Sequence, residues 1–283
     1  MRPGWLLAGA FVFSSAALPA AVTVKDLRCE YAVNPLGIGT AQPRLSWVLE
    51  SDRRGERQTA YQILVAGSEE ALRAGRGDVW DSGRVASADS IQVEYRGKPL
   101  ASRQRCYWKV RAWDRDGNPS PYSETAWWET ALLSPRDWKA GWLGFTPGWP
   151  GRALYFRYDM PLAKPVRQAR AYIAGLGYYE LRINGVRIGD RVLDPAPTDY
   201  SKRVLYSTYD VAAALRTGAN TVGVIAGNGW YGMPKILAQL EVVYEDGSAA
   251  SFFTRGIEAD VQDRWYVTSG PIVANSIYDG EVY

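Results

Sequence analysis

The sequence predicts an all-β protein built as two consecutive antiparallel β-sandwiches. Short segments that alternate apolar and polar residues recur along the chain, and clusters of turn-forming residues separate them. The pair Asn184-Gly185 stands between two such segments, which is the strongest local signal for a β-hairpin. The length of 283 residues allows about two domains, each with a sizeable hydrophobic core.

The first group of predicted strands lies in residues 22–133. Alternation is most regular around Trp108, Val110 and Ala112, which fall on one face of a strand and predict an inward-facing surface. A helical pattern is confined to residues 68–74. Three segments alternate in the way expected of strands: 45–49, 61–65 and 107–113. The turn residues between them favour a small antiparallel sandwich.

The two cysteines of the chain, Cys29 and Cys106, fall within this first domain. Cys106 shares the register of the inward-facing residues, so its side chain is expected to be buried. We favour two buried free thiols. A disulfide stays open as the alternative, because its geometry cannot be obtained from sequence.

Composition excludes several classes of function. The formal net charge is only +3 and the basic residues are scattered, so we expect no nucleic-acid partner. The chain has no histidine and two cysteines, which removes the usual catalytic base and thiolate metal sites, and we expect no metal and no cofactor. Catalysis here would depend on carboxylates, tyrosine, lysine or a hard cation. Twelve Trp and eighteen Tyr favour aromatic sheet surfaces.

Residues 1–21 have the pattern of an export signal. Arg2 precedes an apolar run over residues 5–18, and small residues follow around Ala20 and Ala21. The run is short for a membrane span. We therefore expect export to the periplasm or the outside of the cell, with no membrane attachment after cleavage. An uncleaved N-terminal anchor is the alternative.

Residues 134–151 form a connector rich in Trp, Gly and Pro, in which we expect Trp138, Trp142 and Trp149 to pack between the two domains. A second sandwich follows over residues 152–283. Its expected strands include 153–158, 166–174, 204–209, 221–225 and 236–244. Residues 211–215 predict one helical turn with Asp210 as its N-cap.

Five blocks of the first domain occur in an order that resembles a known family. They are Asn34-Pro-Leu-Gly-Ile38, Pro43-Arg-Leu-Ser-Trp47, Gln58-Thr-Ala-Tyr-Gln-Ile63, Val79-Trp-Asp-Ser-Gly83 and Tyr107-Trp-Lys-Val-Arg-Ala-Trp-Asp114. Together they resemble the fibronectin-III-like N-terminal domain of bacterial α-L-rhamnosidases. The resemblance implies a fibronectin-III-like sandwich over residues 22–133.

The resemblance continues through the second domain. The blocks are Gly175-Leu-Gly-Tyr-Tyr-Glu-Leu-Arg-Ile-Asn-Gly185, Thr198-Asp-Tyr-Ser-Lys-Arg-Val-Leu-Tyr206, Thr208-Tyr-Asp-Val211, Gly227-Asn-Gly-Trp-Tyr-Gly232, Gly270-Pro-Ile272 and Ile277-Tyr-Asp-Gly-Glu281. They resemble the jelly-roll-like rhamnosidase N-terminal β-sandwich. One departure concerns the loop after Asp194-Pro195, where the family usually carries an aromatic residue and this chain has Ala196-Pro197. That stacking surface is missing here.

In the resembling family the catalytic carboxylates lie in an (α/α)6 barrel beyond these two domains, and this sequence has no such helical segment. The resemblance implies the non-catalytic N-terminal part of an exported glycoside hydrolase that removes terminal α-L-rhamnose with inversion. The expected partners are rhamnose-containing glycans and a catalytic domain outside this chain, and the chain alone is expected to be inactive. The alternative is a free-standing carbohydrate-binding or scaffold protein.

The segment 227–232 matches the pattern G-x-G-x-x-G, but a predicted strand follows it where a dinucleotide site needs a helix. We interpret it instead as a loop that presents aromatic side chains. The candidate carbohydrate-binding residues are Trp230, Tyr231 and Tyr200. They are expected to contact either sugar or a neighbouring domain.

Acidic residues provide no catalytic candidates. Glycoside hydrolysis needs two carboxyl groups about 5–9.5 Å apart. Two pairs lie near one another in sequence, Asp279 with Glu281 and Asp194 with Asp199, and a chain with thirty acidic residues produces such pairs by chance. The segment 114–118 offers too few oxygen ligands for a calcium loop and predicts a plain hairpin turn.

Overall fold

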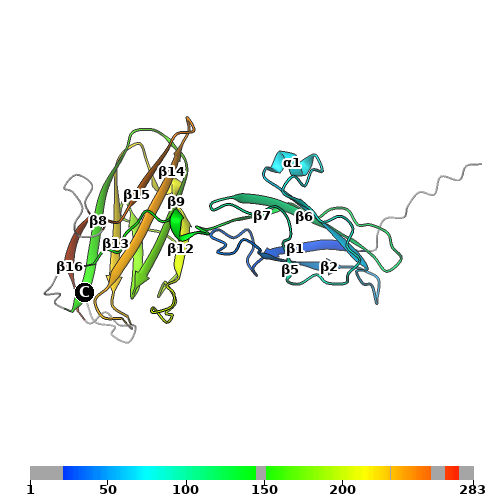
Figure 1. Ribbon diagram of the computed structural model, residues 1–283, viewed down its shortest axis with the longest axis horizontal. Coiled ribbons are helices and arrows are strands. Elements are labelled where there is room, and N and C mark those ends of the chain that lie inside the picture. The colour runs from blue at the N-terminus through cyan, green and yellow to red at the C-terminus, as the bar shows by residue number, and fades with distance from the viewer. Residues whose placement is uncertain (1–21, 145–150, 230, 256–264, 274–283) are drawn as a thin grey trace, which may run out of the picture. The chain divides into compact units, whose positions relative to one another are not determined.

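The computed structural model describes residues 22–144, 151–229, 231–255 and 265–273, and it confirms the all-β prediction (Figure 1). The predicted export signal and Trp149 lie outside these residues. The chain divides into two compact units. The first contains the described residues up to Pro35, with Gln42–Pro99 and Arg105–Trp128; the second contains Leu36–Ala41, Leu100–Gln104 and the described residues from Glu129 onward.

The first unit is a sandwich of two antiparallel sheets, with strand orders β1-β2-β5 and β4-β3-β6-β7. The strands are β1 (Thr23–Cys29), β2 (Arg44–Glu50), β3 (Ala60–Ala66), β4 (Trp80–Asp81), β5 (Val93–Glu94), β6 (Arg105–Trp113) and β7 (Ala126–Glu129). The three segments in which the sequence alternates most regularly lie within β2, β3 and β6. The alternating pattern therefore located the central strands of both sheets.

The core of this unit is aromatic. Along β6 the side chains of Cys106, Trp108, Val110 and Ala112 are fully buried, which confirms the inward face predicted from their spacing. Trp128 packs edge-to-face against Trp108, with ring centroids 6.4 Å apart. Such pairs stabilise a core beyond the area they bury. No ligand is needed to fill this interior.

The one predicted helical segment of the first unit is the helix α1 (Glu69–Arg73). Ser68 caps it, because its side-chain oxygen accepts a hydrogen bond from the backbone N–H of Ala71 at 3.2 Å. Leu72 is fully buried and attaches the helix to the sandwich.

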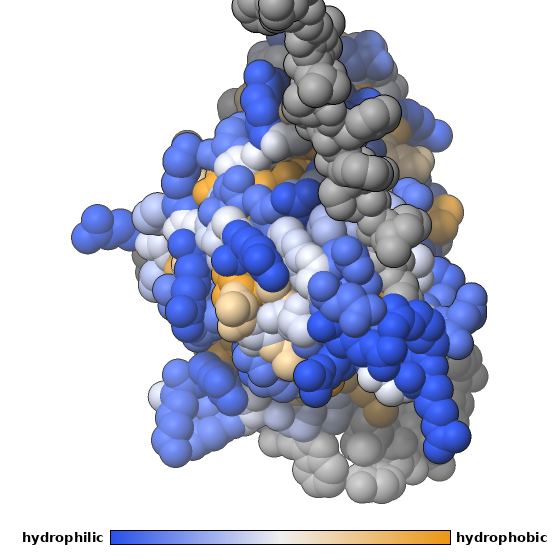
Figure 2. Space-filling model, turned by 90° about the vertical axis from the view of Figure 1, so that its right-hand side faces the viewer, coloured by the Kyte–Doolittle hydropathy of each residue, from blue (hydrophilic) through white to orange (hydrophobic). Residues whose placement is uncertain are grey.

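Figure 2 shows a face of the molecule that is mostly hydrophilic, with small and separate apolar areas.

Both cysteines are buried and neither is in a disulfide, and burial raises the pKa of the Cys29 thiol. We expect neither thiol of the native protein to react with Ellman's reagent. Both thiols should react once guanidinium unfolds the chain. Rapid reaction without denaturant would contradict the burial. If the unfolded chain does not react in the absence of reductant, the two cysteines form a disulfide. As the control, the thiols should react after the chain has been reduced and the reductant removed.

The second unit is a sandwich of a five-stranded sheet, β11-β10-β13-β8-β16, and a four-stranded sheet, β12-β9-β14-β15 (Figure 1). Its strands are β8 (Arg152–Leu162), β9 (Val166–Leu176), β10 (Tyr178–Ile183), β11 (Val186–Arg187), β12 (Tyr206–Asp210), β13 (Gly218–Gly227), β14 (Lys235–Tyr244), β15 (Ala249–Phe253) and β16 (Tyr266–Val273). Phe156, Met160 and Leu162 of β8 are buried between the sheets, whereas Arg157 and Asp159 are exposed. This alternation is what a sheet with one solvated face requires.

The predicted hairpin at Asn184-Gly185 is confirmed. Both residues have positive φ, 52° and 85°, as a type I′ turn demands, and Ile183 pairs with Val186 across it. The Asn184 side chain also accepts a hydrogen bond from the backbone N–H of Thr221 at 3.0 Å. Asparagine thus both allows the turn and ties it to the neighbouring strand.

The helical turn expected at residues 211–215 differs from the prediction. It is a short 3-10 helix, η2 (Ala212–Ala214), and Val211 occupies the cap position without a side-chain hydrogen bond. Asp210 belongs to β12 instead, where its carboxylate accepts from the Ala212 N–H at 3.1 Å. The prediction of Asp210 as the N-cap was wrong by one residue, because the strand continues through it.

The second unit includes three segments that are distant in sequence. The backbone N–H of Ile38 donates to the Glu129 carbonyl at 3.0 Å, and that of Ala131 donates to the Ile38 carbonyl at 2.9 Å. The N–H of Thr130 donates to the Gln104 carbonyl at 2.9 Å. These bonds join all three segments into one backbone network.

A buried ion pair links Glu129, where the last of these three segments begins, to strand β9. The Arg170 guanidinium on β9 donates to both carboxylate oxygens of Glu129, at 2.6 and 2.9 Å, and the two side chains are 5% and 1% exposed. Asp210 lies 2.9 Å from the same guanidinium. Burial alone would lower the pKa of Arg170, but the bonds to Glu129 outweigh it and the pKa is raised.

The connector that follows packs on the same sheet. It contains a short 3-10 helix, η1 (Pro135–Asp137). The Trp138 ring makes edge-to-face contacts with Tyr206, at 5.1 Å, and with Tyr172, at 6.5 Å, while Trp142 is exposed.

The described residues include no helix with the length and apolar character needed to span a membrane.

Candidate functional site

Two loops of the second sandwich meet at one end of it. Residues 188–205 connect the hairpin to β12, and residues 228–234 connect β13 to β14. The first loop runs back along β10 to this end, because Asp194 pairs with Tyr179 and Tyr206 pairs with Ala174, and the second loop starts and ends here, because Gly227 pairs with Tyr178 and Lys235 with Leu176. This end contains the sequence motifs from which candidate binding residues were selected.

Two of the three predicted binding residues meet there. The rings of Tyr200 and Tyr231 lie edge-to-face with centroids 5.5 Å apart and an interplanar angle of 73°. Both side chains are half-buried, so part of each ring faces solvent. Trp230, the third candidate, lies outside the described residues. The pair comes from different loops, and only the fold brings it together.

The glycine-rich loop that carries Tyr231 is a tight turn. The N–H of Tyr231 donates to the Asn228 carbonyl at 2.8 Å. Gly229 has a φ of +50°, and a Cβ atom there would lie 2.7 Å from the ring of Tyr178. The strand β14 follows, so the loop lacks the helix that a dinucleotide-binding motif requires. Gly229 therefore allows close packing against an aromatic ring.

Asp194 organises the other loop. Its Oδ2 accepts hydrogen bonds from the hydroxyls of Ser207, Tyr209 and Tyr179, at 2.5, 2.8 and 3.1 Å. Its backbone carbonyl also accepts from the N–H of Tyr179 at 2.9 Å, and its peptide bond to Pro195 is cis. A single carboxylate therefore fastens the loop to β10 and β12. Sequence reasoning considered Asp194 only as half of a chance acidic pair.

The hydroxyls around Asp194 are held in their protonated, donating form. Burial is the main cause that raises the pKa of both Tyr179 and Tyr209. Arg191 adds a cation beside the cluster, because its guanidinium donates to the Ser207 hydroxyl at 3.0 Å. The sequence signal available for this cluster was the spacing of Ser207 and Tyr209 in β12, which places both hydroxyls on one face of the strand.

The other acidic candidates do not form a catalytic pair. Asp199 accepts a hydrogen bond from the Ser201 hydroxyl and forms an ion pair with Lys202, and both partners lie in its own turn. The Ser201 hydroxyl is the main cause that lowers the pKa of Asp199. Asp279 and Glu281 lie outside the described residues. Ala196 is exposed beside the buried Pro195, so this part of the loop presents no aromatic ring.

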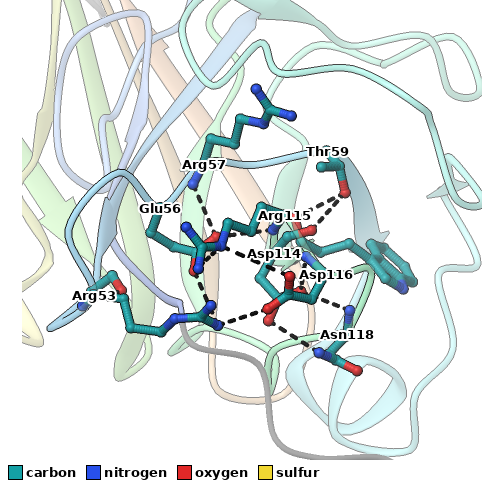
Figure 3. Close-up of polar contacts among 10 residues, drawn as sticks. Arg53, Glu56, Arg57, Thr59, Asp114, Arg115, Asp116 and Asn118 are labelled. Carbon is teal, nitrogen blue, oxygen red and sulfur yellow. Dashed lines mark hydrogen bonds and ion pairs between the residues drawn. The ribbon is translucent and has the colours of Figure 1, made fainter.

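The acidic turn of the first unit, residues 114–118, is held by hydrogen bonds between its own residues (Figure 3). Asp114 Oδ1 accepts from the backbone N–H groups of Asp116 and Asn118, at 3.0 and 2.8 Å. Arg53 bridges to Asp116 at 2.8 Å and lies 3.5 Å from Glu56. These are the contacts of a hairpin turn. Among the described residues, no group of three or more metal-ligating side chains is arranged to hold an ion.

Comparison with known protein families assigns both units. Residues 24–134 match the family described as Rha78A-like, N-terminal immunoglobulin domain. Residues 164–283 match the family described as α-L-rhamnosidase N-terminal domain. The two matches confirm the resemblance to the N-terminal region of α-L-rhamnosidases, and the model for the first match describes an immunoglobulin domain.

Individual relatives agree. An α-L-rhamnosidase from Formosa agariphila is 36% identical over 88% of this chain and 30% of its own length. An α-L-rhamnosidase from Alteromonas sp. is 36% identical over 89% of this chain and 29% of its own length. This chain thus spans about 30% of these relatives, corresponding to their N-terminal part.

Solved structures show the same architecture. The α-L-rhamnosidase from Dictyoglumus thermophilum is 42% identical, with a TM-score of 0.84 over 92% of this chain and 31% of that chain. The Streptomyces avermitilis α-L-rhamnosidase, solved with L-rhamnose, is 26% identical, with a TM-score of 0.76 over 89% of this chain and 42% of that one. The two-sandwich arrangement is therefore one that larger proteins contain.

Proposed function

We propose that this chain, which belongs to the α-L-rhamnosidase family through its N-terminal domains, supports a catalytic domain that removes terminal α-L-rhamnose from glycans. In this proposal the chain is non-catalytic, and its two sandwiches shape and stabilise the enzyme of which they are part. The relatives of known name are α-L-rhamnosidases, and rhamnose-containing glycans are the substrates that the proposal assigns to the whole enzyme.

The observation that carries this proposal is the combination of coverage and fold. The chain matches only about 30% of its relatives. Within the described residues the only α-helix is α1, with five residues, and every other regular element is a strand or a 3-10 turn. The site found in the second unit contains tyrosines and one carboxylate whose Oδ2 accepts three hydrogen bonds, whereas glycoside hydrolysis needs two carboxyl groups.

The experiment is a hydrolysis assay of the purified 283-residue chain with p-nitrophenyl α-L-rhamnopyranoside. We expect no release of nitrophenol above the buffer rate. A full-length relative serves as the positive control. Release by this chain that is lost on replacing Asp279 or Glu281 by alanine would contradict the proposal, because it would place a catalytic pair within these residues.

A second candidate function is sugar binding by the loop end of the second sandwich, and the Tyr200–Tyr231 pair favours it. Partly exposed aromatic rings offer flat apolar faces to the C–H side of a sugar. Titration of methyl α-L-rhamnoside against tryptophan fluorescence tests it, with Tyr231→Ala and Trp230→Ala as variants. Tyr266→Ala, on the exposed face of β16, is the matched control. Identical titrations for wild type and all variants would eliminate this function.

Two finer assignments belong to the same proposal. The first sandwich is fibronectin-III-like, which its division into three and four strands supports. The chain is exported to the periplasm or the outside of the cell, which the apolar run after Arg2 supports. N-terminal sequencing of the protein secreted by an expressing cell tests export, and an intact Met1 in the cytoplasmic fraction alone would contradict it.

A further inference from the structure

The first unit contains a groove that the proposed function does not use. Its volume is about 660 Å³, and the residues that line it come from β2 to β5, from the loop between β4 and β5, and from Arg96 after β5. The lining includes residues of β4 and β5, each of which is an edge strand of one of the two sheets. Pockets that hold small ligands have volumes of about 300–1,000 Å³. The groove therefore has the size of a ligand site.

The wall of the groove is fixed by hydrogen bonds. The backbone of Val85 bonds to that of Tyr61 in both directions, at 2.8 and 3.0 Å. The buried Gln58 holds the loop from inside, because its amide donates to the carbonyls of Ser87 and Asp89, at 3.1 and 2.8 Å. The Gln58 oxygen in turn accepts from the Trp47 indole at 3.0 Å. A preformed site of this kind loses little conformational entropy when it binds.

An unpaired hydroxyl lies in the groove. Tyr61 is 8% exposed and lines the groove, and within the described part of the chain its hydroxyl has no hydrogen-bond partner. Burial, together with the nearby Asp89 carboxylate, raises the pKa of Tyr61, so the group stays protonated and able to donate. The hydroxyl oxygen is not among the fully buried unpaired polar atoms, so it reaches the space of the groove and can bond a ligand there.

Apolar surface accompanies this hydroxyl. Trp80 lines the groove half-buried, with its ring fixed edge-to-face against Tyr95 at 5.3 Å. Ile91, also in the lining, is 68% exposed, the highest value among the large apolar side chains described in the first unit. A rigid indole and an exposed aliphatic side chain in the lining favour a ligand with an apolar face.

The charges in the groove favour an uncharged ligand. Two arginines and three acidic residues line it, so their signs nearly cancel. Arg96 is mostly exposed and its ion pair with Glu94 is long, at 3.7 Å, which leaves its donors available. Asp81 Oδ1 already accepts from Gln62 and Gly83, and its Oδ2 remains as an acceptor. Donors and acceptors of both kinds suit a ligand with many hydroxyl groups.

Other ligand classes fit less well. The edge strands β4 and β5 contain two residues each, too few to template an added peptide strand. The excess of acidic over basic groups disfavours an anion. We propose that this groove is a binding site for a neutral sugar, whose C–H face contacts Trp80 and Ile91 and whose hydroxyls bond Tyr61 and Arg96. This site is separate from the tyrosine pair of the second unit and does not depend on the proposed function.

Isothermal titration calorimetry of the full chain tests the proposal. The probes are methyl α-L-rhamnoside, methyl α-D-glucoside, methyl β-D-galactoside and cellotetraose, with tri-galacturonate and an extended decapeptide as contrasts. We expect saturable binding of at least one neutral sugar. Loss of one hydrogen bond in Tyr61→Phe should weaken it about three- to tenfold. Arg96→Gln should weaken it by a similar factor.

Matched variants make the result decisive. Tyr107→Phe removes a hydroxyl on β6 outside the groove, and Arg54→Gln removes an exposed arginine that does not line it, so neither should change the affinity. Tyr231→Ala separates this site from the second unit and should also leave the groove's affinity unchanged. The proposal is overturned if no neutral sugar binds saturably, if only the contrasts bind, or if binding is insensitive to Tyr61→Phe but lost in Tyr231→Ala.

Discussion

Replacement of Glu129 by alanine is expected to lower the free energy of unfolding of the second unit by about 3–5 kcal/mol. The substitution leaves the Arg170 guanidinium buried, with 5% exposure, and removes both of its short charge-assisted bonds. Asp210 retains one contact with it but is half exposed and offers little compensation. Urea denaturation measures the loss, and hydrogen exchange of the amides in β9 and β12 shows where it occurs.

Two controls define the physical cause. Asp159→Ala breaks an exposed ion pair with Arg157 in the same unit and should cost less than about 1 kcal/mol. The double variant Glu129→Met with Arg170→Met should recover much of the loss, because it removes the isolated charge and leaves apolar volume in its place. A loss for Glu129→Ala no larger than that for Asp159→Ala would contradict the buried ion pair.

Replacement of Asp194 by alanine is expected to cost about 3 kcal/mol, because three hydroxyl groups then lose their shared acceptor. The affected loop, 188–205, loses its attachment to β10 and β12. Faster hydrogen exchange in this loop should accompany the lower stability. We also expect weaker contact between Tyr200 and Tyr231, since Tyr200 lies on the loop that Asp194 fastens.

Asp194→Asn refines this prediction. Its amide oxygen can accept only part of the three bonds and carries no charge, so the loss should lie between wild type and Asp194→Ala. Asp199→Ala is the matched control, because that carboxylate bonds only within its own exposed turn and should cost under about 1 kcal/mol. Equal effects of Asp194→Ala and Asp199→Ala would show that the hydroxyl cluster contributes little.

Most strands of both units could be predicted from the sequence because their signals are local. Alternation along β6 specifies which side chains face inward, and Asn184-Gly185 meets the backbone requirement of its turn without help from the rest of the fold. The five blocks of the first domain and those of the second added the family. Asp210 was misplaced because a strand and a helix cap differ there by one residue.

The sites depend on contacts that no local pattern contains. The Asp194 cluster joins residues 179, 207 and 209, which come from strands in two different sheets. The groove of the first unit likewise joins Tyr61 with Ile91, thirty positions apart, across a loop without regular structure. Each residue alone is an ordinary tyrosine, isoleucine or aspartate. Only the pairing of strands shows which of them meet.

The backbone network of the second unit bears on how this protein can be dissected. A fragment that begins at Ser134, the start of the connector, would lack Glu129 and would leave Arg170 buried without its carboxylate. It would also lack the whole backbone network of residues 129–131 with Ile38 and Gln104. The autonomous folding piece is therefore not a continuous stretch of chain. A fusion or domain swap that uses the second unit therefore has to include Glu129 at the end of β7. It also has to include residues 36–41 and 100–104, which belong to this unit although they precede its first long strand, β8.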